Sequence, residues 1–317
     1  MKIVEKSACS FDQWYPKLKK WSVSAELEPI PDDVLEFLRS DIVTVPVEAS
    51  VRRKLTSYID DITYKNWDSD DEGDVDDEIS PPSFPAFSAR LSECMERLGG
   101  GVFVKLNWSA PTDAAWMATN SSLKCTNLQD LYLLLKSSGK ISDDLEIKGQ
   151  EKYYVVMKKW LDIHPGTEFR CFVSNGELIA ISQRNNTEFH EHFQENVCST
   201  VGNIKSFYYT KVKENFDLNC FVMDVIYTEN SIKIVDINTF EESTNPGLFS
   251  WSELKDMEYV EGVSPEFRYI SEDIGIQPAR HAQHFGLPID LTELSEEKSQ
   301  SIIELLQAQV LSQRQED

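Results

Sequence analysis

The sequence predicts an α+β fold built on antiparallel sheets. Two observations carry this prediction: β-rich runs occur in pairs joined by short turns, and helical segments lie between these pairs rather than after every strand. A third observation excludes the commonest nucleotide-binding folds, because neither GxGxxG nor GxxxxGKS/T occurs. Any phosphate site must therefore use side chains and a metal ion instead of a glycine loop at a helix end. The chain has 317 residues, 41% of them hydrophobic, which is enough for one sizeable core or two closely packed halves.

The N-terminal part predicts helices. Pro31 and two aspartates precede apolar residues at helical spacing up to Leu38. Pro46 opens a second run of this kind, with apolar residues up to Tyr58. The same periodicity returns at residues 84–98. We therefore expect two short amphipathic helices and, after an interruption, a third.

The interruption is acidic. Eight of the eleven residues from Asp68 to Glu78 are acids, and the stretch has too few apolar groups to offset the entropy of ordering it. Two prolines at 81 and 82 close it. Because helical periodicity resumes directly afterwards, we interpret residues 68–82 as a disordered acidic insertion within one folded unit.

Extended segments follow the third helix. The run VFVKLNW alternates after three glycines and predicts a strand with Lys105 near its end. A helix is expected at 128–135, and the run YYVVMKKW at 153–160 is extended. The dipeptide Asn175-Gly176, between TEFRCFVS and ELIAISQR, is the strongest hairpin signal in the chain.

The last part of the chain predicts one more hairpin and two helices. The runs NCFVMDVIY and SIKIVDI predict a hairpin around residues 228–230. Residues 193–215 are expected to be helical, with Gly202-Asn203 as a point where the helix could break. Residues 292–313 have the pattern of an amphipathic tail helix.

The charge balance bounds the partners. The chain carries 31 Lys and Arg against 54 Asp and Glu, a net charge of -23. A nucleic-acid backbone would be repelled, so DNA and RNA are not expected as partners. The acidic surface suits a basic protein partner, although solubility alone explains it equally well.

Composition also bounds the compartment. No stretch approaches the roughly 20 apolar residues needed to span a bilayer, and the N-terminus lacks the order of a signal peptide. The six cysteines are scattered, without a CxxC pair. We therefore expect a soluble, monomeric, cytoplasmic protein with no membrane contact, whose cysteines are reduced and mostly buried.

Polar side chains interrupt the strands of the second hairpin. Asp224 lies within the apolar run FVMDVIY, and Asp236 and Asn238 end the run IKIVDIN. Residues i and i+2 of a strand share a face, so Asp236 and Asn238 present oxygens to one point. Asp224 joins them if the residue numbers of paired residues on the two strands add to an even sum, as with a loop of three or five residues. These hard oxygen ligands match Mg²⁺. The alternative is a set of strand-end acids that face solvent.

Basic side chains could form an anion site. Arg170 and Arg184 lie on opposite arms of the first hairpin, roughly across from one another. Two adjacent guanidinium groups repel, which predicts a shared anion such as a triphosphate. Lys105, at the end of its strand, and His192 could add phosphate contacts. For each of these residues the alternative is an ordinary surface or structural side chain.

Several of these motifs occur together in one known family. The stretches KLNWSAPTDAAWM (105–117), NSSLKC (120–125), EFRCFV (168–173), ISQR (181–184), FVMDV (221–225) and VDIN (235–238) resemble the cell division cycle 123 family. The resemblance runs from the N-terminal helices to about Trp251. Proteins of that family have an ATP-grasp fold and act in assembling eukaryotic translation initiation factor 2, binding its gamma subunit. The resemblance therefore implies two α+β halves that clamp ATP.

The resemblance also implies roles for single residues. Phosphate contacts would come from Lys105, Asn107 and Ser109 in one half and from Arg170 and Arg184 in the other. The segment 155–162 would be the hinge, with residues 157–160 flanking adenine and Asp162 at the ribose, while Asp224, Asp236 and Asn238 would hold magnesium. The residues expected at the ATP site are Lys105, Asn107, Trp108, Ser109, Met157, Lys158, Lys159, Trp160, Asp162, Arg170, Arg184, His192, Asp224, Asp236 and Asn238.

These assignments imply an organisation along the chain. Residues 1–67 would form the N-terminal helical part of the first lobe, 83–154 the rest of that lobe, 155–290 the hinge and second lobe, and 291–317 a helical tail. Two departures from the family pattern occur near the site. The family usually has Asp-Phe-Asn-Pro-Phe where this chain has DINTF at 236–240, and commonly has aspartate in place of Asn185. Both departures leave the expected metal ligands intact.

Three functions compete at this stage. The first is an ATP- and magnesium-binding chaperone that assembles the initiation factor through its gamma subunit. The second is an ATP-grasp ligase that forms an acyl phosphate on a carboxylate substrate. The third is a nucleotidyl transferase with Lys105 as covalent nucleophile, but such lysines lie in Lys-x-Asp-Gly, and residues 105–108 read KLNW. We expect the first, and whether the chain is an enzyme stays open.

Overall fold

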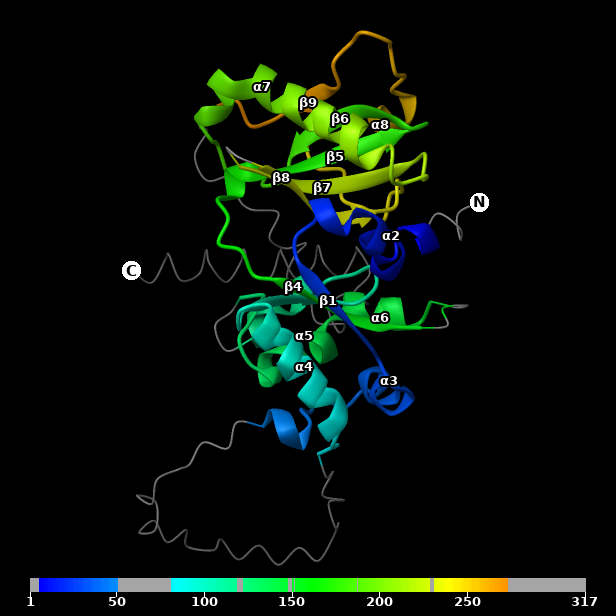
Figure 1. Cartoon of the computed structure of the whole chain (residues 1–317), viewed down its shortest axis with the longest axis vertical. Coiled ribbons are helices and arrows are strands. Elements are labelled where there is room, and N and C mark those ends of the chain that lie inside the picture. The colour runs from blue at the N-terminus through cyan, green and yellow to red at the C-terminus, as the bar shows by residue number, and fades with distance from the viewer. Residues whose placement is uncertain are drawn as a thin grey trace, which may run out of the picture.

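The chain forms two lobes, each built on one sheet, that are stacked along the long axis of the molecule (Figure 1). The first sheet has the strand order β1-β4-β2-β3, and the second has the order β8-β7-β5-β6-β9. All neighbouring strands are antiparallel except β6 and β9. The predicted α+β class is therefore confirmed. The structure, a computed structural model, describes residues 6–50, 81–118, 122–147, 150, 152–186, 188–228 and 231–272.

The first sheet carries helices on one face. Its strands are β1 (Ala25–Pro29), β4 (Tyr154–Lys159), β2 (Val102–Lys105) and β3 (Lys124–Cys125). The helices are α3 (Asp32–Arg39), α4 (Pro85–Arg97), α5 (Leu128–Ser137) and α6 (Gly139–Leu145). Their apolar residues form one core with the sheet. The helices predicted at 32–38, 84–98 and 128–135 are thus present.

Side chains of β4 alternate between the two faces of this sheet. Val155 and Met157 point into the helix-covered core, and Val156 lies in the core of the second lobe. Lys158 shares the face of Val156. On β2, Lys105 is paired with Val156 in the register and lies on that same face. Two lysines of the first lobe are therefore directed toward the second lobe.

Two hairpins build the second sheet. Its strands are β5 (Glu168–Ser174), β6 (Glu177–Gln183), β7 (Phe221–Thr228), β8 (Ser231–Asn238) and β9 (Glu266–Arg268). Asn175 and Gly176 both have positive φ, 53° and 76°, as the tight turn predicted from this dipeptide requires. Both predicted hairpins are confirmed.

The second sheet is covered on both faces. Helix α7 (His192–Phe207) runs without a break past Gly202 and continues as a π-helix, η5 (Tyr208–Val212), so the predicted helix is present and the break is not. The buried residues of this helix pack with one face of the sheet. On the other face, Phe172 packs against Phe249 and Trp251, the latter in α8 (Trp251–Asp256).

The first described helix belongs to the second lobe. Helix α2 (Phe11–Leu18) and the 3₁₀ turn η1 (Lys19–Trp21) precede β1 in the chain, yet four side chains of α2 are buried in the core of the second sheet. Residues 1–67 were expected to be a helical part of the first lobe. Instead, this part of the chain enters the core of the second lobe through α2 before β1 joins the first sheet. The four buried side chains are Phe11, Trp14, Tyr15 and Leu18.

Some expectations fall at the edge of the described residues or outside them. Where the second N-terminal helix was expected, the structure describes a 3₁₀ turn, η2 (Val47–Ala49), and the rest of the segment predicted to be helical, from residue 51, lies outside the described residues. The acidic insertion up to residue 80 and the C-terminal tail also lie outside them. Among the described helices, none combines the length and apolar character that a bilayer span requires. The remaining short turns are η3 (Thr112–Met117) and η4 (Pro165–Thr167).

Candidate functional site

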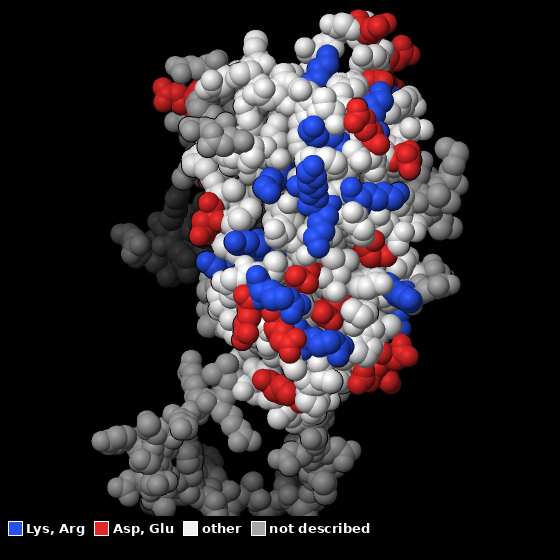
Figure 2. Space-filling model, in the orientation of Figure 1, with Lys and Arg blue, Asp and Glu red and all other residues white. Residues whose placement is uncertain are grey.

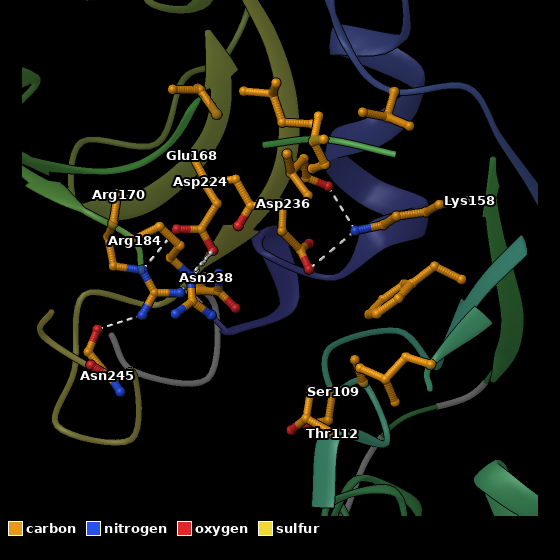
Figure 3. A pocket seen from close by; sticks show the side chains of 18 of the residues that line it. Ser109, Thr112, Lys158, Glu168, Arg170, Arg184, Asp224, Asp236, Asn238 and Asn245 are labelled. Carbon is orange, nitrogen blue, oxygen red and sulfur yellow. Dashed lines mark hydrogen bonds and ion pairs between the residues drawn. The ribbon is translucent and has the colours of Figure 1, made fainter. Parts of the chain in front are cut away.

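A cleft of about 1300 Å³ is lined by both lobes. The segment that leaves β4 after Lys159 crosses between the two sheets and forms part of its wall through residues 160–165. Six Lys or Arg and six Asp or Glu residues line the cleft, although acids outnumber bases 54 to 31 in the whole chain. The cleft is therefore enriched in positive charge relative to the rest of this acidic protein. Figure 3 shows residues of both lobes directed into it.

Asp224 and Asp236 lie directly opposite one another on β7 and β8. Near the turn, Thr228 pairs with Ser231, so the residue numbers of paired residues add to an odd sum there. A β-bulge between Asp224 and Val225 then shifts the register by one residue, because Val225 pairs with Ile234 and no partner is left for Val235. The bulge brings both aspartates onto one face and so meets the condition set from the sequence, by a route other than the loop of three or five residues named there.

Arg170 forms a bidentate ion pair with Asp224. Its Nε and Nη2 donate to the two carboxylate oxygens, each at 2.7 Å, and both side chains are almost completely buried. Arg184 Nε lies 3.8 Å from the same carboxylate. Burial alone would raise the pKa of Asp224, but the two guanidinium groups outweigh it and lower that pKa below its ordinary value. The anion shared by the two arginines in this structure is thus Asp224.

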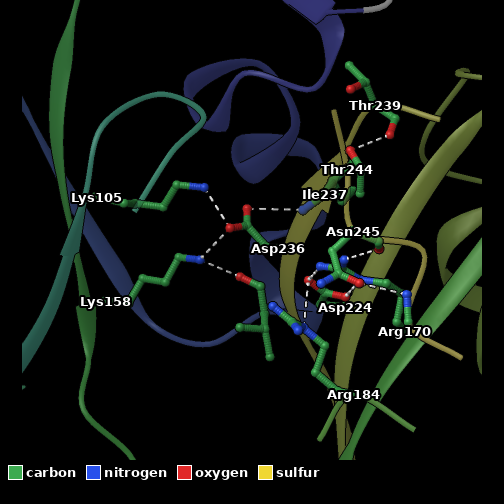
Figure 4. A network of polar contacts seen from close by, with 12 residues as sticks. Lys105, Lys158, Arg170, Arg184, Asp224, Asp236, Ile237, Thr239, Thr244 and Asn245 are labelled. Carbon is green, nitrogen blue, oxygen red and sulfur yellow. Dashed lines mark hydrogen bonds and ion pairs between the residues drawn. The ribbon is translucent and has the colours of Figure 1, made fainter. Parts of the chain in front are cut away.

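Asp236 accepts from two lysines of the first lobe (Figure 4). Lys105 Nζ donates to Oδ2 at 2.6 Å, and Lys158 Nζ lies 3.3 Å from the same oxygen. Lys158 also donates to the carbonyl of Val235, the bulge residue, at 2.7 Å. Burial lowers the pKa of Lys158 to about 8, and the nearby charge of Asp236 opposes this shift. These contacts join the two lobes across the cleft.

The loop after β8 closes one side of the cleft. The backbone carbonyl of Asn245 accepts from Arg170 Nη1 and so holds the third donor group of that side chain. Gly247 follows with φ +66°, and a Cβ at this position would lie 2.5 Å from Ser182 Oγ. The same hydroxyl accepts from Leu248 N at 3.1 Å. Glycine at 247 therefore permits the close packing that fixes Asn245 beside Arg170.

Most of the predicted site residues line the cleft, but not all. Lys105 lies behind the wall, only 1% exposed, and reaches the site through Asp236. Met157 is buried in the first core, on the opposite face of β4. The side chain of His192 lies outside the described part of the chain, although its backbone begins α7. The predicted residues that line the cleft are Trp108, Ser109, Lys158, Lys159, Trp160, Asp162, Arg170, Arg184, Asp224, Asp236 and Asn238.

Asn107 has a structural position. Its side-chain amide donates to Ser10 Oγ at 3.1 Å and to Asp12 Oδ1 at 3.2 Å, and its carbonyl accepts from Tyr154 N at 2.9 Å. It is completely buried and does not line the cleft. Asn107 thus ties the start of α2 to the first sheet, and a direct contact of its side chain with phosphate would require these bonds to break.

Several cleft residues were missed from the sequence. Glu168 lines the cleft two positions before Arg170, and burial raises its pKa above the ordinary value. The i, i+2 spacing from Arg170 on a strand was a usable signal for it. Asp144 accepts from Ser109 N at 2.7 Å and Oγ at 2.9 Å, a pairing between residues 35 apart that no local pattern indicates. Asn245 acts through its backbone carbonyl, which side-chain patterns do not reveal.

Two carboxylates and one amide of the cleft are the residues that could hold a magnesium ion. Asp224 and Asp236 supply two carboxylates on one face, and Asn238 supplies an amide oxygen two positions beyond Asp236. Both oxygens of Asp224 accept from Arg170 in this structure, so an ion would have to replace cation contacts. In the described ranges no cluster of three or more His, Cys, Asp or Glu side chains is arranged for a metal. Phosphate and water oxygens would therefore complete the coordination.

Comparison with known proteins decides the family. The model of the family described as D123 matches residues 14–295. The chain belongs to the D123 family. It is 37% identical over 309 residues to the "Translation initiation factor eIF2 assembly protein" of Xenopus tropicalis, with 90% of each chain covered. The protein of the same name from Kluyveromyces lactis is 36% identical over 320 residues, covering 91% of this chain and 87% of the relative.

A solved structure shares the fold of this D123 protein. Cdc123 from Schizosaccharomyces pombe matches with a TM-score of 0.67 and 30% identity, covering 84% of this chain and 96% of that chain. The resemblance to the cell division cycle 123 family inferred from the motifs is therefore confirmed. The α+β fold that this resemblance implied is the fold of the D123 chain.

Proposed function

We propose that the chain binds ATP with magnesium and acts as an assembly chaperone for translation initiation factor eIF2. One observation carries the nucleotide part: four cations from both lobes, Lys105, Lys158, Arg170 and Arg184, converge on two carboxylates in the cleft. A triphosphate carries the negative charge and the acceptor oxygens that such a set of cations could bind. The assembly part is supported by relatives that carry the name eIF2 assembly protein and are covered over most of their length.

The site would work by exchange of ion pairs. Arg170, Arg184 and Lys158 would turn from carboxylates to phosphate oxygens. Asp224 and Asp236, thereby released, would hold magnesium together with Asn238, and the ion would neutralise phosphate charge. In the absence of ligand each carboxylate faces two cations, so the four cations exceed the two carboxylates by two positive charges, and a triphosphate would supply the missing negative charge.

The crossing segment would hold the nucleoside. Trp160 and Asp162 line the cleft, and Trp160 Nε1 donates to Asp162 Oδ1 at 2.8 Å, which orients both side chains. The indole offers a flat face for adenine, and the carboxylate offers acceptors for ribose hydroxyls. Since this segment connects the two sheets, a nucleotide bound there would set the orientation of one lobe against the other. A defined orientation would in turn present one surface to the gamma subunit of eIF2.

Calorimetry tests the nucleotide site. We expect ATP to bind with magnesium and to bind more weakly with EDTA present. Asp236→Asn should remove most of the magnesium dependence, because one of the two carboxylates is lost. Glu93→Gln, an exposed carboxylate on α4, is the matched control and should leave the heats unchanged. Equal heats for the wild type and Asp236→Asn, with both proteins folded by circular dichroism, would remove Asp236 from the metal site.

A capture experiment tests the partner. The isolated gamma subunit of eIF2 should be retained by the immobilised chain, and more strongly with ATP and magnesium than without. Arg184→Gln should lower the retention to the nucleotide-free level. Equal retention of the gamma subunit with and without ATP would show that partner binding does not depend on the nucleotide. Release of ADP in proportion to an added carboxylate compound would favour the ligase instead, whereas the burial of Lys105 against Asp236 disfavours a covalent lysine adduct.

A further inference from the structure

A basic patch lies on the second lobe, outside the cleft. It consists of Lys17 at the end of α2, Lys19 and Lys20 in η1, and Lys233 in β8. The chain after η1 pairs with β8, since Val23 N donates to the carbonyl of Ile234 at 2.9 Å, so Lys233 lies beside η1. We call these four lysines the η1 patch. Figure 2 shows Lys and Arg gathered in the middle of this face, in the region that η1 and α2 occupy in Figure 1.

Among the residues that the structure describes, the η1 patch is exposed and its positive charge is not offset by an ion pair. All four lysines are exposed, and none forms an ion pair with a carboxylate of the described chain. Other surface lysines of the second lobe do pair: Lys213 with Glu177 at 2.7 Å, and Lys255 with Glu242. In a chain of net charge -23, acids were available to neutralise the patch. Like charges placed together cost free energy, which a ligand of opposite charge would recover.

Aromatic side chains accompany the charges. Lys20 Nζ lies 5.6 Å from the ring centre of Trp21, which is half-buried, and Lys17 Nζ lies 5.8 Å from that of Phe216. These contacts restrain the lysine side chains and so reduce the entropy that a ligand must offset on binding. The half-buried indole adds apolar contact area next to the positive charge. Such a combination fits a peptide with acidic and apolar residues better than a free phosphate ion.

We infer that the η1 patch binds a short acidic segment of a partner protein. The segment must be short, because the patch holds four charges and the rest of the molecule is strongly acidic. Nucleic acid or an anionic membrane would extend beyond the patch onto that acidic surface and be repelled there. This contact is separate from the proposed ATP site. It would bind an acidic segment, whereas the overall acidity of the chain favours a basic partner.

This inference can be tested by fluorescence anisotropy. The probe is a labelled peptide in which glutamate residues alternate with leucine-serine pairs. The full chain should bind the peptide, and binding should weaken as salt is raised from 50 to roughly 300 mM because the pairs are exposed. The double variant Lys19→Glu with Lys20→Glu should weaken binding by about tenfold or more. Lys19→Arg with Lys20→Arg should retain it, since the charge is kept.

A matched control separates the patch from net charge. Lys152→Glu with Lys255→Glu changes the net charge by the same amount at exposed positions outside the patch and should alter binding by less than about twofold. Equal loss in both double variants, or no peptide binding by the wild type, overturns the inference. Tighter binding of single-stranded RNA or of phosphatidylserine vesicles, lost in Lys19→Glu with Lys20→Glu, overturns it in favour of that class. Circular dichroism and thermal unfolding confirm that the variants are folded.

Discussion

Asp224 forms an ion pair with the buried guanidinium of Arg170, which has no other carboxylate partner in the described chain. Replacing Asp224 with alanine leaves the charge of Arg170 buried and uncompensated, so we expect the free energy of unfolding to fall by about 3 to 5 kcal/mol. Urea unfolding measures this change. Glu242→Ala, which removes the exposed pair with Lys255, is the control and should cost about 0 to 1 kcal/mol. Similar losses in the two variants would show that the Arg170 pair carries no special weight.

The buried and exposed thiols differ in their access to reagents. Burial raises the pKa of Cys94 and of Cys125 to about 12, whereas Cys198 is exposed on α7. A thiol loses its proton only as the pH approaches its pKa, so at pH 8 these two carry almost no thiolate. We expect brief iodoacetamide treatment of the native protein to label Cys198 and to spare Cys94 and Cys125, as read by peptide mass spectrometry. Rapid labelling of Cys94 under native conditions would contradict its burial.

At the scale of elements, the loop between β8 and α8 depends on one glycine. Gly247→Ala puts a Cβ against Ser182 Oγ and strains the left-handed backbone, so we expect a loss of about 1 to 2 kcal/mol in unfolding free energy. ATP affinity should fall with it, because the loop positions Asn245 at Arg170. Thermal unfolding and calorimetry measure the two effects. Gly202→Ala in α7, where a Cβ meets nothing within 4 Å, should instead stabilise by about 0.5 to 1 kcal/mol.

Local signals allowed most elements to be predicted. The turn at Asn175-Gly176 needs positive φ at both positions, and this dipeptide tolerates it, so the first hairpin followed from two residues. Helix α2 was missed although Phe11, Trp14, Tyr15 and Leu18 recur at helical spacing, because Pro16 lies within the run. Pro16 is nevertheless accommodated in this short helix.

The charged residues of the site could be predicted from the sequence, but the residues that they contact could not. Asp224, Asp236 and the arginines were identified because charge is costly in a buried strand unless it is compensated. The bulge at Val235 could not be predicted, since no local pattern marks it and its carbonyl contacts Lys158 of the other lobe. The same holds for Met157 and Asn107: the face of a strand and the side of a loop depend on contacts between distant segments.

At the scale of the whole molecule, α2 contributes to a lobe that the rest of the chain builds much later. Trp14 is completely buried in the core of the second sheet. We expect Trp14→Ala to lower the free energy of unfolding by about 3 to 5 kcal/mol, because a large cavity forms. Urea unfolding with far-ultraviolet circular dichroism measures it. Trp116→Ala, at a side chain that is 58% exposed, is the control and should change stability by less than about 0.5 kcal/mol.

The position of α2 also orders events during synthesis. Its apolar residues are made before every strand of the second sheet, and the sheet they pack on is complete only when β9 has been made, about 250 residues later. At roughly 5 to 20 residues per second, this delay is on the order of 10 to 50 s. The first sheet can form earlier, since its last strand in the chain is β4. Helix α2 is thus made long before the sheet that buries it is complete, and until then its aromatic residues are open to aggregation or to a general chaperone.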